Sequence, residues 1–119
     1  MTLLTANNYA LSLIHQQRYQ ESKSLLRRTL PAARRAHGDS HETTLRMRGY
    51  YAEVLYMDDG ATLDDLREAV TTLEETERTA RRVFGGAHPL TTGIEGELRN
   101  SRTVLRARED GKEVQFVKH

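Results

Sequence analysis

The chain has 119 residues, enough for one domain of ordinary size. It contains no cysteine, which excludes disulfides, thiolate metal sites and a cysteine nucleophile. Its formal net charge is +1, from 18 basic and 17 acidic side chains, and this balance weighs against a domain built to bind polyanions.

Apolar side chains at helical spacing predict five helices. The first helix shows the pattern clearly, because Ala6, Ala10 and Leu13 recur on one face. The composition, rich in arginine, leucine, glutamate and alanine with only two prolines, also favours helix. In chain order, the expected helices cover about residues 4–16, 19–37, 42–57, 63–84 and 89–108.

Several residues are expected to shape the ends and the course of these helices. Pro31 lies inside the second helix, where it predicts a kink just before it or a division into two abutting helices. Gly38 is expected to end that helix as a left-handed cap. Thr62 and Asp65 have the spacing of a capping box, and Pro89 suits the first turn of the last helix.

The sequence repeats itself at two different offsets. Residues 37–41 recur as residues 84–88, which is 47 positions later. Tyr9-Ala10 instead recurs as Tyr51-Ala52, 42 positions later. The difference predicts a five-residue insertion in the second copy, placed at Met57–Thr62 as an exposed, extended loop between helices.

The repeated unit resembles a tetratricopeptide repeat. The resemblance rests on Asn7–Ala10, Arg18–Ser22, Leu25–Arg28 and Gly38–His41, taken in that order. The 42-residue spacing and the Gly-x-x-His-Pro loop at 85–89 resemble the kinesin-light-chain variety of the repeat. One departure is a glutamine, at position 17, where the family usually has a glycine, so a left-handed turn there would be costly.

This resemblance implies an all-α fold: a short right-handed α-solenoid of antiparallel helix pairs, with five helices in about two and a half repeats. The repeat domain is expected to span residues 1–109, in units of about 4–41, 42–88 and 89–109. A polar tail would follow at 110–119, in which residues 114–117 form either a short strand or a docked extension.

The resemblance also implies a scaffold that binds a peptide segment of a partner in its inner groove, without enzymatic activity or a cofactor. In the family this groove is lined by the first helix of each pair. Asparagine can pair with a peptide backbone, and arginine and tyrosine are common at binding hot spots. The positions carried over are Asn7, Leu11, Ile14, His15, Arg46, Gly49, Glu53, Tyr56, Asn100 and Thr103.

Metal binding and catalysis are not expected. His37 and His41 have a metal-ligand spacing, but Gly38 breaks the helix between them and the second copy has Phe84 in place of the first histidine. We therefore expect ring packing at position 37 and a loop-holding ring at position 41. The acidic segment 58–60 lacks the ligand ladder of a calcium loop, and no nucleophile stands with a base.

Arginine supplies fifteen of the eighteen basic residues. Arg27-Arg28 and Arg34-Arg35 recur seven positions apart on one helix, and 99, 102 and 106 form a second arginine row. These rows indicate either a solvated face crossed by ion pairs or an edge that recognises an acidic peptide. Residues 1–60 carry +2 and residues 61–119 carry −1, so nucleic acid is an improbable partner.

Two alternatives to peptide binding remain open at this point. One is a self-associating module, a homodimer through exposed end helices, because Leu3 and Leu4 begin the chain without polar cover. The other is a small nucleic-acid-binding or regulatory domain that uses the arginine rows. No apolar run approaches the ~20 residues of a membrane span, and a cytoplasmic location is expected.

Overall fold

The computed structural model describes residues 1–111, and this part of the chain consists of helices joined by short turns. The five expected helices are confirmed, with ends that differ from the prediction by one residue at most. They are α1 (Leu3–His15), α2 (Tyr19–His37), α3 (Glu42–Met57), α4 (Leu63–Phe84) and α5 (Pro89–Glu109). The strand or docked extension expected at 114–117 lies outside the described residues.

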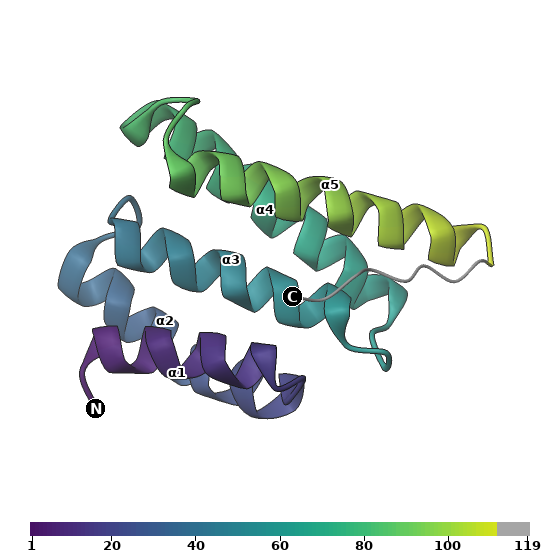
Figure 1. Ribbon diagram of the computed structural model, residues 1–119, viewed down its shortest axis with the longest axis horizontal. Coiled ribbons are helices and arrows are strands. Elements are labelled where there is room, and N and C mark those ends of the chain that lie inside the picture. The colour runs from purple at the N-terminus through teal and green to yellow at the C-terminus, as the bar shows by residue number, and fades with distance from the viewer. Residues whose placement is uncertain (112–119) are drawn as a thin grey trace.

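The helices form two layers (Figure 1). Helices α1, α3 and α5 lie side by side in one layer, and α2 and α4 lie behind them. Each helix packs on the next in sequence, and α3 also packs on α1 and α5. No Cα atom of α2 comes within 8 Å of one in α4. This arrangement is the all-α repeat of helix pairs that the sequence predicts.

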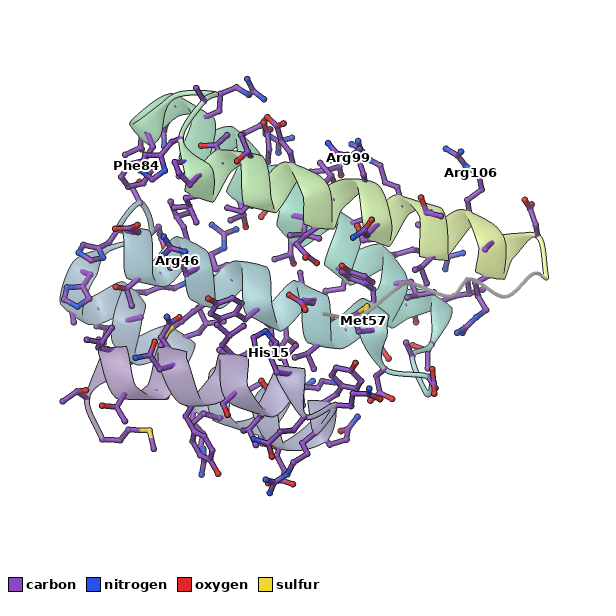
Figure 2. The ribbon with its side chains drawn as sticks, viewed as in Figure 1. His15, Arg46, Met57, Phe84, Arg99 and Arg106 are labelled. Carbon is purple, nitrogen blue, oxygen red and sulfur yellow. The ribbon has the colours of Figure 1, made fainter. Side chains whose placement is uncertain are left out.

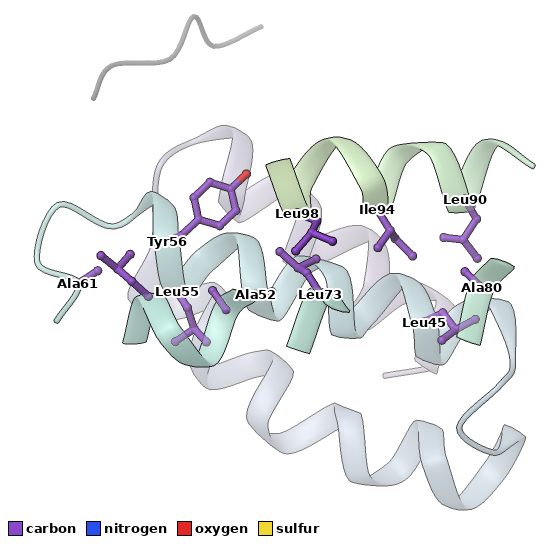
Figure 3. Close-up of a cluster of buried hydrophobic side chains, with 12 residues drawn as sticks. Leu45, Ala52, Leu55, Tyr56, Ala61, Leu73, Ala80, Leu90, Ile94 and Leu98 are labelled. Atoms are coloured by element: carbon purple, nitrogen blue, oxygen red, sulfur yellow. The ribbon is translucent and has the colours of Figure 1, made fainter. Parts of the chain in front are cut away.

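Two apolar clusters hold the helices together, and α3 belongs to both. Leu45 and Leu55 of α3 join side chains of α4 and α5 in one cluster (Figure 3). Met47 and Val54 join α1 and α2 in the other. Because α3 is buried on two sides, it is the helix through which the two halves of the molecule share a core.

Gly38 and Gly85 end α2 and α4 in the same way. Their φ angles of 86° and 90° are positive, as expected, but their ψ angles of 169° and 160° are extended. The prediction of a left-handed helical cap is therefore correct in the sign of φ but wrong in the value of ψ. The observed conformation is essentially restricted to glycine, so the requirement for glycine is stricter than the sequence suggested.

A histidine begins the helix after each of these glycines. Nδ1 of His41 accepts a hydrogen bond from the Thr43 amide, and Nδ1 of His88 accepts one from the Leu90 amide, both at 3.1 Å. The two rings lie against His37 and Phe84, with ring centroids 4.3 and 4.8 Å apart. The expected packing and loop-holding roles are confirmed, since each ring caps a helix and closes the loop.

The turn and the proline of the first repeat differ from simple helix geometry. Gln17 has a φ of 61°, so the left-handed turn is made despite its cost without glycine. Helix α2 continues through Pro31 as one helix, so the alternative of two abutting helices is wrong, and the kink just before Pro31 stays a prediction. The proline supplies no N–H for the carbonyl group of Arg27, four residues earlier.

The inserted segment between α3 and α4 is more closely held than predicted. Asp59, Gly60 and Thr62 are exposed and Met57 and Asp58 are half-buried, whereas Ala61 is 6% exposed and belongs to the core. Nη1 of Arg108 donates to the Ala61 carbonyl at 2.6 Å. The expectation of an exposed, extended loop is therefore wrong at Ala61, because the last turn of α5 covers this residue.

This packing predicts that Ala61→Asp destabilises the protein by more than about 2 kcal/mol, because it places a charge in the core beneath α5. The matched change Asp59→Asn, two residues away on the exposed side, should alter the free energy of unfolding by no more than about 0.5 kcal/mol. Urea denaturation followed by circular dichroism measures both. Equal effects of the two changes would contradict the buried position of Ala61.

Candidate functional site

A groove with a volume of about 170 Å³ lies between α3 and α5, on the layer that contains the first helix of each pair. Its floor is apolar, because Leu90 and Ile94 are 5% and 4% exposed and belong to the core. Glycines form part of its walls, and charged side chains lie along it. The lining residues are Arg46, Gly49, Tyr50, Glu53, Pro89, Leu90, Gly93, Ile94 and Glu97.

Two of the lining residues are glycines in the middle of helices. A glycine at such a position costs about 0.5–1 kcal/mol relative to alanine. A Cβ atom added at Gly49 or Gly93 would meet no atom within 4 Å, and neither residue has a positive φ. Packing and backbone conformation within the chain therefore do not require glycine here. What the two glycines provide is open space in the groove, and Gly93, which is exposed, also gives access to helix backbone.

One side of the groove carries a half-buried carboxylate, that of Glu97. The Tyr56 hydroxyl donates a hydrogen bond to Oε2 of Glu97. Burial raises the pKa of Glu97, and the hydrogen bond from Tyr56 opposes this only in part. Burial, followed by the charge of Glu97, raises the pKa of Tyr56 well above its usual value. Within residues 1–111, no basic side chain forms an ion pair with Glu97.

The basic lining residue is already paired. Nη2 of Arg46 lies 2.8 Å from Oε1 of Glu42, one turn earlier on α3. The hydrogen bond and charge of Arg46 lower the pKa of Glu42. Both side chains remain nearly half exposed, so the pair contributes little to stability, and the guanidinium stays within reach of a ligand.

The groove contains three of the residues proposed from the sequence, namely Arg46, Gly49 and Glu53. Three others point into the protein instead: Asn7, Ile14 and Tyr56 are only 4–6% exposed. The prediction that these three side chains line an open groove is corrected, because they are packed into the interior of the protein.

The remaining proposed residues lie near the groove or away from it. Asn100 is half-buried and forms a hydrogen bond with Tyr56. Leu11 and His15 belong to α1 and do not line this groove. Thr103 is exposed, and its hydroxyl donates to the carbonyl group of Arg99 within its own helix at 3.0 Å. None of these four lines the cavity, and a role for them in binding stays a prediction.

The α5 wall of the groove was missed by the sequence reasoning. That reasoning took the same face of every first helix, whereas a groove between two helices needs opposite faces of its two walls. The face of α5 towards α3 begins with Leu90 and continues at helical spacing through Gly93 and Glu97. A glycine and a glutamate interrupting an apolar helix face were the available signal.

Within residues 1–111, no group of histidine and carboxylate side chains has the arrangement of a metal site. In the same part of the chain, no helix is long and apolar enough to cross a bilayer. What the groove offers is an apolar floor, open helix backbone and charged side chains, which together suit contact with a peptide chain.

The sequence profile described as tetratricopeptide repeat matches residues 1–60, half of the chain. The chain belongs to the tetratricopeptide repeat family. Repeats of this family generally mediate protein–protein interactions and are typically non-catalytic scaffolds. The match agrees with the observed helix pairs, and the packing of each helix on the next continues beyond the matched residues through α4 and α5. No curated protein and no solved structure matches the chain significantly.

The half-buried carboxylate of Glu97 leads to a prediction about pH. A glutamate whose pKa is raised in the folded state lowers stability once pH exceeds the pKa of the unfolded chain. Glu97→Gln removes the charge and should therefore raise the free energy of unfolding at pH 7. The gain should shrink towards zero near pH 4, where the carboxyl group is protonated. Urea titrations at the two pH values test this, and a loss of stability at pH 7 would contradict it.

Proposed function

We propose that this tetratricopeptide repeat protein is a non-catalytic interaction module that binds an extended segment of a protein partner in the groove between α3 and α5. The observation that supports this most strongly is the pair of mid-helix glycines, Gly49 and Gly93, which lower stability while leaving the groove open. An apolar side chain of the partner would contact Leu90 and Ile94 on the floor. The partner backbone would run along the glycine walls.

The charges of the groove limit the chemistry of this segment. Glu97 forms no ion pair within the described residues. The charges of Glu97 and Glu53 both act on Tyr56, so the two carboxylates lie on the same side of the groove. Like charges in a poorly solvated position repel, so an acidic side chain would be disfavoured at this side of the groove. The expectation of an acidic partner therefore receives no support from the α3–α5 groove.

The finer family assignment is part of the proposal. The 42-residue spacing of the repeat and the loop Gly85–Pro89 favour the kinesin-light-chain variety of the repeat. His88 caps α5 from that loop, so the motif has a structural purpose in this chain. A cytoplasmic location stays a prediction from the sequence.

The groove is tested by filling it. Gly93→Leu places a large side chain in the cavity, whereas Gly96→Leu makes the same change on α5 at a position that does not line it. Peptides of about twelve residues are selected from a displayed library on the wild-type protein, and their affinities for both variants are then measured. We expect Gly93→Leu to weaken binding at least tenfold and Gly96→Leu to leave it within about twofold. Selected peptides that ignore Gly93→Leu would refute the groove as the binding site.

Self-association is a second candidate function, and the N-terminal end of the molecule supports it. Met1, Leu4 and Tyr9 are 79%, 65% and 43% exposed, and all belong to α1 or precede it. The opposite end differs, because Arg99 and Arg106 project outward from α5 (Figure 2). A two-fold dimer that pairs the N-terminal ends would cover the apolar side chains and close on itself.

This dimer predicts that the protein mass measured by light scattering rises with concentration across a tenfold range. Leu4→Glu should return the mass to that of a monomer, because it places a charge in the paired face. Val83→Glu is the matched control, since Val83 is 45% exposed on α4 and lies outside that face. A monomer mass at every concentration would exclude the dimer.

A further inference from the structure

A second cavity lies on the opposite layer, between α2 and α4, with a volume of about 300 Å³. The two helices are not in backbone contact, and α3 forms the floor between them. Arg48 and Tyr51 reach this floor from α3, and Leu30 and Pro31 form part of the α2 wall. This cleft is separate from the α3–α5 groove, because the two share no lining residue.

Arg48 is an arginine whose guanidinium is only partly satisfied by ion pairs and hydrogen bonds within the described residues. Its side chain is 12% exposed, and its Nη2 lies 3.2 Å from Oε2 of Glu75. Its Nε is buried without a hydrogen-bond partner. Burial, and after it the positive charge of Arg34, lowers the pKa of the Arg48 guanidinium. The single ion pair with Glu75 therefore does not offset the cost of burying the positive charge of Arg48.

Two further arginines stand on the α2 wall. Arg34 is half exposed and lies 3.3 Å from Asp39, whose side chain is 73% exposed, so solvent weakens this ion pair. Arg27 is exposed, and a hydrogen bond to Tyr51 raises its pKa. The two arginines are seven residues apart on one helix, which places them about 10 Å apart along its axis. Both can turn towards a ligand without unpacking the core.

The charges and the apolar surface of the cleft point to one class of ligand. Three arginines line it against two glutamates, Glu68 and Glu75, an excess of one positive charge (3 − 2). Leu30 and Pro31 lie on the wall between the two arginines of α2. Pro31 is exposed, so its ring adds apolar surface to this wall.

We infer that the cleft between α2 and α4 binds an acidic peptide segment of a partner protein. Its carboxylates contact Arg27 and Arg34, and an apolar side chain between them lies on Leu30 and Pro31. Arginine suits this role because its planar fork can form two parallel hydrogen bonds with one carboxylate. A free inorganic anion would satisfy the arginines but would not use the apolar wall. The arrangement therefore favours a peptide over a simple anion.

The probe is a fluorescein-labelled, N-acetylated and C-amidated peptide of sequence Glu-Glu-Leu-Glu-Glu, with the glutamine analogue as its uncharged counterpart. Binding to the full chain is measured by fluorescence anisotropy at 50 and 150 mM salt. Arg34→Gln should weaken binding about tenfold, the loss expected for one charged hydrogen-bond pair. Arg99→Gln removes one arginine from α5 outside the cleft and should change binding less than twofold. Circular dichroism checks that both variants remain folded.

The remaining outcomes of this experiment each support or overturn an acidic-peptide site between α2 and α4. Equal losses in Arg34→Gln and Arg99→Gln would show general electrostatic attraction and would overturn the proposal. So would inorganic phosphate that displaces the peptide at equal concentration, because the site would then be a simple anion site. Unchanged affinity for Gly93→Leu is expected, whereas a strong loss in that variant would place the peptide in the α3–α5 groove instead. Absence of saturable binding at 50 mM salt would also refute it.

Discussion

The two-sided burial of α3 is the constraint on which the rest of the molecule depends. Leu45, Ala52 and Leu55 face one apolar cluster, while Met47 and Val54 face the other. Within residues 1–111, no other helix contributes to both apolar clusters. The same helix also lines both cavities described above: Gly49 lines the groove towards α5, and Arg48 lies on the floor of the cleft between α2 and α4. The shared core and both proposed binding surfaces thus involve the same sixteen residues.

The order of the helices and their ends could be predicted from the sequence, because these are set by local chemistry. The repeated glycine and histidine around Gly38 and Gly85 define both loops, and Thr62 and Asp65 form the expected capping box. Such signals need only neighbouring residues. The ψ angles of the two glycines were not predictable in this way, because the histidine rings that follow draw each loop into an extended path.

The site was less predictable, because it depends on how helices meet. Tyr56 has the amphipathic character of a binding residue, yet its ring is buried and its hydroxyl contacts Glu97, 41 residues later. Ala61 has the sequence context of a solvated loop, yet α5 covers it. Its hydrogen-bond partner, Arg108, is 47 residues away in the sequence. Neither contact leaves a periodic trace in the sequence. Arg46 and Gly49 were found because the repeat pattern alone fixes the exposed face of α3.

The absence of backbone contact between α2 and α4 has a mechanical consequence. Within residues 1–111, α3 packs on both α1 and α5 in the front layer, whereas in the rear layer α2 and α4 each pack on α3 but have no Cα atoms within 8 Å of one another. Bending of the solenoid is therefore easiest about an axis in the packed front layer. Such bending would widen or narrow the gap between α2 and α4. A segment bound between α2 and α4 would limit how far this gap can narrow, and would thereby restrict bending of the stack towards that side.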